Sequence, residues 1–193
     1  MLCEVIDNFF DPEYLYEIYN QICQIPVTIT NIANRKTFPY GNEGTHRLMG
    51  STIFSRSNFN RVEVLHSSAG MFFDIFEGIS EKIQNDLYLK GIYTNVQHNG
   101  CNGTTHIDGR ENSEYSIIVM TNPVWDDSWS GEFQVMRDFE TVIETYKYIP
   151  GRIIIVPGSQ PHRALGPKKE YIYRTSIAYR IVVPDGAPLT LID

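Results

Sequence analysis

The chain has 193 residues, of which 42% are hydrophobic and 20% charged. These values favour one globular domain and exclude a disordered chain. Its 16 basic and 23 acidic residues give a net charge of −7, which argues against general binding to nucleic-acid backbones. No apolar run approaches the roughly 20 residues that span a membrane, and the acidic N-terminus is unlike a signal peptide. We therefore expect a cytoplasmic protein that makes no membrane contact.

The first half of the chain is predicted to be helical. Asp11 and Pro12 are typical of a helix start, with the Asp11 side chain as a capping acceptor and proline in the first turn. A second helix is expected from about Ser68 to Lys90, because apolar residues recur there at helical spacing and Gly91 then ends the pattern. The apolar positions that carry this pattern are Phe72, Ile75, Phe76, Ile79, Ile83 and Leu87.

The segment between these helices, from Asn31 to Asn60, is rich in Asn, Gly, Ser and Thr, and is interpreted as loops with a short hairpin. It overlaps the most basic stretch of an acidic chain, residues 31–61. There Arg35, Lys36, Arg47, Arg56 and Arg61 are opposed by Glu43 alone. Two interpretations stay open. The stretch is either an ordinary solvated surface or a site that attracts an anionic substrate.

After Gly91 the pattern changes to short strands separated by turns that contain Gly, Pro and Asn. The expected strands cover residues 92–98, 115–121, 131–136, 153–156 and 171–183. Strands at this spacing predict an α+β, mainly β protein, with a jelly-roll core backed by the N-terminal helices. The whole chain, 1–193, is expected to form one domain: a helical and loop-rich part (1–90), the jelly-roll core (91–183) and a short tail (184–193).

Two histidines and one aspartate form the most informative pattern in the strand-rich half. On an extended segment, His106 and Asp108 point to the same side. His162 follows the turn 157–161, where a jelly roll would return it to the first two residues. Two imidazoles and one carboxylate on one face of a metal leave three positions open, as in non-haem Fe(II) enzymes that use O₂. The alternative is that an isolated His-x-Asp is a chance pair in a surface loop.

An arginine on the last long strand predicts an anion site. The strand carries apolar residues on both faces, so Arg174 is expected to be buried, and a buried guanidinium needs an anionic partner. A dicarboxylate held at one end by Arg174 and Ser176 could chelate a metal with its other end. An ion pair with one of the chain's own acidic residues is the alternative.

An ordered series of short motifs resembles the Fe(II)- and 2-oxoglutarate-dependent dioxygenases, in particular their prolyl-4-hydroxylase-like branch. The series covers most of the chain, and each motif is weak alone. Its members are the opening residues 5–13, Gly100 six positions before His106, the two strands around residues 116–122 and 129–133, the turn 150–152, Pro161-His162 and the run 174–176.

This resemblance implies a double-stranded β-helix fold. It implies Fe(II) held by His106, Asp108 and His162, and 2-oxoglutarate whose distal carboxylate lies on Arg174. O₂ is the implied co-substrate and ascorbate an accessory reductant. Gln97 stands where the family often has a tyrosine and serves as a polar substitute. Met120 stands where the family has a further aromatic hydroxyl near the co-substrate.

The implied reaction couples decarboxylation of 2-oxoglutarate, to succinate and CO₂, with hydroxylation of an unactivated C–H bond. A peptidyl or free amino-acid side chain of the prolyl type is the first expectation, so the partner is a peptide or a small molecule. A second hypothesis is a nucleic-acid or nucleotide oxygenase, because Arg174 and Arg180 frame a string that faintly resembles that of the AlkB-type demethylases. The third is a metal-binding jelly roll without activity.

Overall fold

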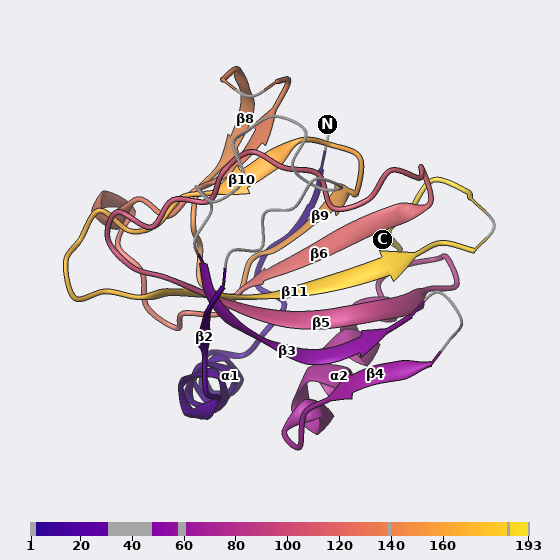
Figure 1. Cartoon of the computed structure of the whole chain (residues 1–193), viewed down its shortest axis with the longest axis horizontal. Helices are drawn as coiled ribbons and strands as arrows, with labels where there is room; N and C mark the ends of the chain where they lie inside the picture. The colour runs from indigo at the N-terminus through magenta and orange to yellow at the C-terminus, as the bar shows by residue number, and fades with distance from the viewer. Residues whose placement is uncertain (1–2, 31–47, 58–60, 139, 185, 193) are drawn as a thin grey trace.

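The computed structural model describes residues 3–30, 48–57, 61–138, 140–184 and 186–192, and it folds into two antiparallel sheets with two α-helices outside them (Figure 1). In chain order the elements are β1 (Glu4–Ile6), α1 (Pro12–Gln24), β2 (Thr28–Thr30), β3 (Leu48–Arg56), β4 (Val62–Leu65), α2 (Ala69–Ser80), β5 (Tyr88–Gln97), β6 (Glu114–Met120), η1 (Asp127–Trp129), β7 (Phe133–Met136), β8 (Val142–Tyr146), β9 (Ile153–Pro157), β10 (His162–Ala164) and β11 (Arg174–Val182).

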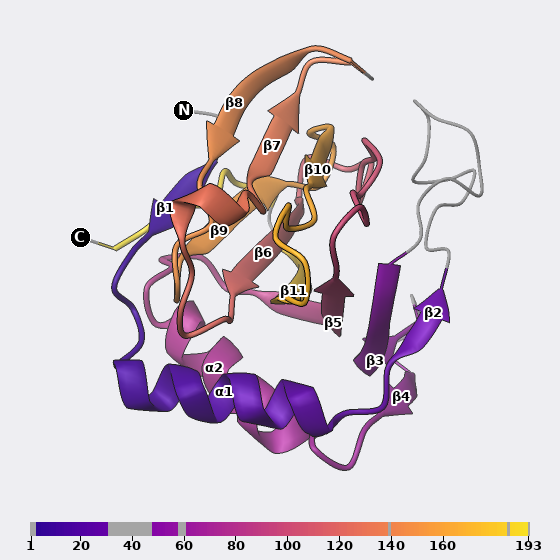
Figure 2. The same cartoon turned by 90° about the vertical axis from the view of Figure 1, so that its left-hand side faces the viewer.

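The large sheet has the strand order β1–β9–β6–β11–β5–β3–β2, with β4 also paired to β3, and the small sheet has the order β10–β7–β8. Seen from the side, both helices cover one face of the large sheet and the small sheet lies over the other face (Figure 2). This arrangement is the predicted α+β, mainly β jelly roll backed by helices. No helix in the described part of the chain is long and apolar enough to cross a membrane.

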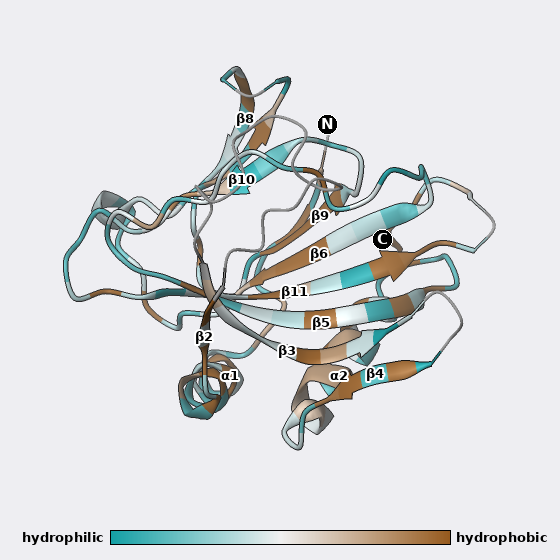
Figure 3. Cartoon of the chain, in the orientation of Figure 1, coloured by the Kyte–Doolittle hydropathy of each residue, from teal (hydrophilic) through white to brown (hydrophobic). Residues whose placement is uncertain are grey.

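The central strands are apolar on both faces because each face meets a different layer. On β6, Ile117 and Val119 belong to the core under the helices, whereas Ile118 and Met120 belong to the core between the sheets. The consecutive isoleucines of β9 divide between the two cores in the same way. Long hydrophobic stretches are visible in β9 and in part of β6 (Figure 3). A strand buried on both faces reads as a continuous apolar run.

The start of α1 differs from the prediction in one respect. Pro12 occupies the first turn as expected, but the Asp11 side chain makes no capping hydrogen bond. The backbone carbonyl of Asp11 accepts from the N–H of Leu15 instead, at 3.0 Å. The predicted capping role of the Asp11 side chain is therefore wrong, although the helix begins where the sequence predicts.

The second predicted helix is about ten residues too long, because α2 ends at Ser80. Beyond it the chain meets the C-terminal segment: Ile83 pairs with Leu191, and the Asn85 side chain accepts from the N–H of Thr190 at 2.9 Å. Ile83 is buried by this contact without being helical. The chain then enters β5 at Tyr88, within the predicted helix.

The loop prediction for residues 31–60 is wrong for its last part. Residues 48–56 form β3, which pairs with β5 in the large sheet, and β1, β2 and β4 add further strands to the half predicted to be helical and loop-rich. Gly50 explains part of the sequence there, since a Cβ at this position would lie 2.3 Å from the carbonyl oxygen of Thr94 on β5. Residues 31–47 and 58–60 lie outside the described residues.

Candidate metal centre

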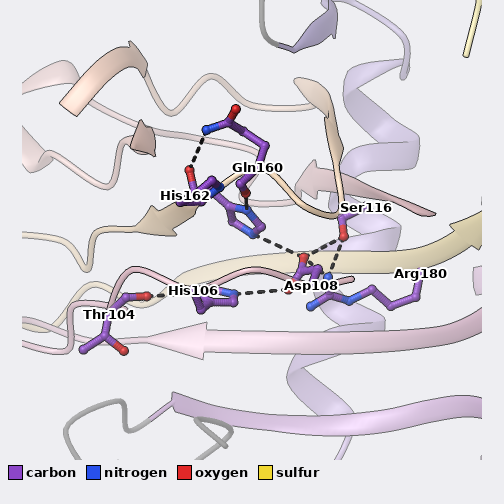
Figure 4. A network of polar contacts seen from close by, with 8 residues as sticks. Thr104, His106, Asp108, Ser116, Gln160, His162 and Arg180 are labelled. Carbon is purple, nitrogen blue, oxygen red and sulfur yellow. Dashed lines mark hydrogen bonds and ion pairs between the residues drawn. The ribbon is translucent and has the colours of Figure 1, made fainter. Parts of the chain in front are cut away.

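Backbone pairing brings the two predicted histidines together. The N–H of His106 donates to the carbonyl of His162 at 3.0 Å, and the N–H of His162 donates back to His106 at 2.9 Å. Their ring centroids lie 4.6 Å apart. The segment after His106 is then held to the turn before β10, where the N–H of Asp108 donates to the carbonyl of Gly158 at 2.8 Å. Figure 4 shows the three side chains converging on one point.

Both imidazoles are set in the same tautomer. Nδ1 of His106 lies 2.9 Å from the carbonyl of Thr104, and Nδ1 of His162 lies 2.8 Å from that of Gln160. A carbonyl only accepts, so each Nδ1 carries the proton and each Nε2 carries a lone pair. Burial lowers the pKa of His162 to about 4, and burial together with His162 lowers that of His106 well below its ordinary value. Both rings are therefore neutral at pH 7.

The Asp108 carboxylate faces both of these lone pairs. Its Oδ1 lies 3.3 Å from Nε2 of His106, and its Oδ2 lies 3.2 Å from Nε2 of His162. Oδ2 also accepts from the Ser116 hydroxyl at 2.6 Å and forms an ion pair with Arg180. Oδ1 is buried and has no hydrogen-bond donor. The carboxylate is thus anchored on one side by β6 and β11 and directed on the other side at the two imidazoles.

This donor set fits a divalent cation. Two unprotonated nitrogens facing a carboxylate repel it unless a positive charge lies between them, and the ligand atoms all lie within 4.8 Å of one another. Ligands about 2.1 Å from one ion and at right angles to each other are about 3 Å apart, close to the two nitrogen–oxygen distances. The Phe133 ring stacks on the His162 ring, with their centroids 5.2 Å apart. This contact helps to keep Nε2 of His162 directed at Asp108.

Arg174 lies on the face of β11 that also carries Arg180, and it is buried. No acidic residue among those described forms an ion pair with it. The expected alternative, an internal ion pair, is therefore not found in this part of the chain. Nε of Arg174 donates to the carbonyl of Gly131 at 2.9 Å, and Nη1 donates to Gln97 Oε1 at 3.0 Å and to Ser176 Oγ at 3.3 Å. Nη2 is buried with no hydrogen-bond partner.

A buried guanidinium without a counter-charge is costly, since desolvation of an ion is worth several kcal/mol. Burial lowers the pKa of Arg174, although the fields of Tyr148 and Glu132 oppose this effect. The spare Nη2 donor and the unbalanced charge suit a carboxylate, which pairs with a guanidinium through two parallel hydrogen bonds.

One cavity of about 660 Å³ joins these features. All the site residues predicted from the sequence line it: Gln97, His106, Asp108, His162, Arg174 and Ser176. Gln97 is held in place through Nε2, which donates to the carbonyls of Cys101 at 2.9 Å and Ala164 at 3.0 Å. Met120, at the other position where the sequence departs from the family, is buried, and its sulfur accepts from the N–H of Ile149.

The sequence did not point to the groups that support these residues. Ser116 and Arg180 hold the Asp108 carboxylate, and Tyr148 places its ring 5.0 Å from the Arg174 guanidinium. The sequence pattern indicates Arg180 only as part of the AlkB-like string. Arg180 lies four residues after Ser176 on β11. Because side chains of a strand alternate between its two faces, this spacing predicts that Arg180 faces the same cavity as Ser176. Nothing in the sequence pattern singled out Tyr148.

No protein-family model and no curated protein sequence matches the chain. Solved structures do match it. An oxidoreductase of the 2OG-Fe(II) oxygenase family from Burkholderia pseudomallei has a TM-score of 0.69 at 15% identity, over 94% of this chain and 85% of that chain. A prolyl hydroxylase from Trichoplax adhaerens, in complex with a hypoxia inducible factor peptide fragment, has a TM-score of 0.64 at 13% identity, over 96% and 85%.

HygX from Streptomyces hygroscopicus, with nickel, 2-oxoglutarate and hygromycin B bound, has a TM-score of 0.59 at 9% identity, over 94% of this chain and 82% of that chain. At these identities the likeness concerns the fold. This chain has the fold of the 2OG-Fe(II) oxygenases, prolyl hydroxylases among them. The double-stranded β-helix that the motif series implied is confirmed.

Proposed function

We propose that this chain is an Fe(II)- and 2-oxoglutarate-dependent oxygenase, with His106, Asp108 and His162 as the metal ligands. The observation that carries the proposal is that an unprotonated His-Asp-His set and an arginine with an unused buried donor line the same cavity. The fold shared with oxygenases of this kind adds support. Bound Fe(II) supplies the oxidising chemistry that couples decarboxylation of 2-oxoglutarate, with O₂, to hydroxylation of a C–H bond.

The chain's own residues bind and orient. The two neutral imidazoles and the Asp108 carboxylate would hold the metal and would contribute one negative charge to it. Ser116 and Arg180 keep that carboxylate from rotating. Arg174, supported by Gln97 and Ser176, receives the distal carboxylate of 2-oxoglutarate on its spare donor. Apolar residues of the inner core, Ile118, Phe133 and Ala178, line the same cavity and exclude water.

The substrate belongs to the class of peptides or small molecules, with a prolyl-type amino-acid side chain as the first candidate. The size of the cavity supports this, because about 660 Å³ is typical of sites for small ligands and exceeds what a five-carbon diacid fills. Two proteins of the same fold are described with such ligands, a peptide fragment in one and hygromycin B in the other.

The test is succinate formation from 2-oxoglutarate with and without Fe(II), in the wild type, in His106→Ala and in the control His98→Ala. His98 is an exposed histidine outside the cavity. We expect Fe(II)-dependent turnover in the wild type and in His98→Ala, and a loss of at least about a thousandfold in His106→Ala. Equal turnover in both variants, or a wild type that binds neither metal nor 2-oxoglutarate, would overturn the proposal.

The substrate class is tested by incubating active enzyme with proline-containing peptides and recording the mass gain of one oxygen atom. Oxygen incorporation that requires both Fe(II) and 2-oxoglutarate supports the prolyl-type substrate. Active turnover of 2-oxoglutarate with no oxidised peptide in a broad panel contradicts it.

A further inference from the structure

The cavity continues past the metal centre to a second group of cations. On the cavity face of β11, Arg174 and Arg180 lie about 20 Å apart along the strand, and Arg180 contacts Asp108. Next to Arg180, across β5 and β3, the cavity is lined by Lys90 and Arg56. We call these two residues the basic end. The metal ligands thus lie between Arg174 and the basic end.

The charges around the cavity do not balance within the described residues. Four cationic side chains line it against two anionic ones, in a chain whose net charge is −7. Arg180 is paired with Asp108, and Nζ of Lys90 lies 3.0 Å from Oε1 of Glu114. Arg174 is assigned to the co-substrate. Arg56 is the remaining cation, and no described acidic residue pairs with it.

Arg56 is held in position by aromatic rings rather than by a counter-charge. Its guanidinium lies 5.1 Å from the centre of the Phe54 ring and 5.7 Å from that of Tyr88. These ring contacts orient the Arg56 guanidinium but do not neutralise its positive charge. Its Nε is buried and has no hydrogen-bond partner. Arg56 therefore resembles Arg174 in having a spare donor on a buried atom.

Irregularities in the strands place both cations at the cavity. The pairing of β3 with β4 shifts register between Ser55 and Arg56, and the pairing of β11 with β5 shifts so that Lys90 has no opposite residue. Such bulges redirect side chains and are frequent beside functional sites. The next residue, Gly91, leaves room for the Tyr93 ring, because a Cβ there would lie 2.6 Å from the Tyr93 hydroxyl oxygen. An aromatic ring thus covers this part of the cavity floor.

We propose that the basic end binds an anionic group of the substrate, a carboxylate or a phosphate, with Arg56 as the principal contact and Lys90 as the second. The inference rests on the proposed function and specifies its substrate class: an acidic molecule whose charge lies on Arg56 while its reacting C–H bond lies at the metal centre. It also selects between the two interpretations of the basic stretch. Arg56 faces the cavity and Arg61 is exposed, whereas Arg35, Lys36 and Arg47 lie outside the described residues.

The experiment measures probe binding to protein loaded with Ni(II) and 2-oxoglutarate, so that the Arg174 end is filled. The probes are inorganic phosphate and a matched pair of blocked peptides, N-acetyl-prolyl-glutamate amide and N-acetyl-prolyl-glutamine amide. The variants are Arg56→Gln, the charge-preserving Arg56→Lys, and Arg137→Gln, which removes an exposed arginine outside the cavity. Circular dichroism and the 2-oxoglutarate affinity show whether each variant is folded.

We expect at least one anionic probe to bind about tenfold more tightly than the glutamine peptide in the wild type. Arg56→Gln should abolish the difference, Arg56→Lys should keep most of it, and Arg137→Gln should leave it unchanged. A preference for phosphate or for the glutamate peptide identifies which anion the site takes. Equal binding of the anionic probes by the wild type and a folded Arg56→Gln, or no binding of either anionic probe, would overturn the inference.

Failure of this inference is distinguishable from failure of the proposed function. The titration is repeated on protein without metal and 2-oxoglutarate, where the basic end is still present. Fe(II)-dependent succinate formation with no anion preference overturns the inference alone. Anion binding that depends on Arg56, in a protein that never turns over 2-oxoglutarate, supports the anion site and overturns the oxygenase.

Discussion

The two arginines of β11 face the same cavity with the same charge but are stabilised in different ways. Arg180 forms an ion pair with Asp108 and donates to the Ser116 hydroxyl at 2.6 Å, so its charge is balanced within the chain. Arg174 has only neutral hydrogen-bond partners and one buried donor without any. Under the proposed function this difference separates two roles: Arg180 would hold the Asp108 carboxylate in place, whereas Arg174 would bind an anion that comes from outside the chain.

Substitution of Arg174 is expected to have the largest effect, and that effect is on the affinity for 2-oxoglutarate. Arg174→Gln should weaken 2-oxoglutarate binding to Ni(II)-loaded protein about a hundredfold, because it removes one partner of a desolvated charge pair. Arg174→Lys should lose less 2-oxoglutarate affinity, because lysine keeps the positive charge but lacks the two parallel N–H donors of the guanidinium. Calorimetric titration measures both constants. An affinity within a factor of three of the wild type for Arg174→Gln would mean that the diacid is held elsewhere.

A smaller effect, on metal affinity, is expected at the other arginine. Arg180→Gln should weaken Ni(II) binding about tenfold, because the Asp108 carboxylate loses a group that orients it. Once metal is saturating, 2-oxoglutarate should bind this variant as it binds the wild type. Competition against a chelator gives the metal constant. A variant that keeps its metal affinity but loses 2-oxoglutarate would reverse the two roles.

The smallest expected effect concerns protein stability and involves a third arginine. Arg152, in the 150–152 turn, donates from Nε and Nη2 to the two carboxylate oxygens of Asp7, both at 2.7 Å, and joins the start of the chain to β9. Asp7 is 39% exposed, so Asp7→Asn should reduce the free energy of unfolding by only about 0.5–1 kcal/mol at pH 7.

The pH dependence of this small effect has a definite sign. The hydrogen bond from Arg152 lowers the pKa of Asp7 in the folded protein. The stabilisation is therefore complete above the unfolded value of about 3.9 and is lost as the pH falls through the lower, folded pKa. Urea unfolding of wild type and Asp7→Asn at several pH values measures it. If the difference in the free energy of unfolding between the wild type and Asp7→Asn grew as the pH fell, a stabilising Asp7–Arg152 ion pair would be contradicted.

The placement of His106 beside Asp108, and of Arg174 beside Ser176, could be predicted because these signals are local, whereas their roles toward metal and co-substrate stay predictions. The spacing of His106 and Asp108 puts both on one side of an extended segment, and strand alternation puts Arg174 and Ser176 on one face of β11. Gln97 is likewise the residue opposite Arg174 in the pairing of β5 with β11. The double-stranded β-helix was implied by the resemblance of the ordered motif series to the 2-oxoglutarate-dependent dioxygenases.

The features that could not be predicted are strand 48–56, the end of the second helix and the contacts of Ser116. They depend on pairing between segments far apart in the sequence, which no local pattern encodes. The strand 48–56 contains Gly50 and polar residues that fit only because β5 lies beside them. Ile83 keeps a helical spacing although the C-terminal segment, and not a helix, buries it. Ser116 and Arg180 both reach Asp108 because the register of β6 and β11 places these two residues opposite each other. The expectation of one domain over 1–193 stays a prediction.

The direct backbone pairing of His106 with His162 has a consequence for unfolding. A cation bound by both rings would act as a reversible cross-link across the long chain segment between them, much as a disulfide closes a loop. Heat resistance should then rise with metal concentration.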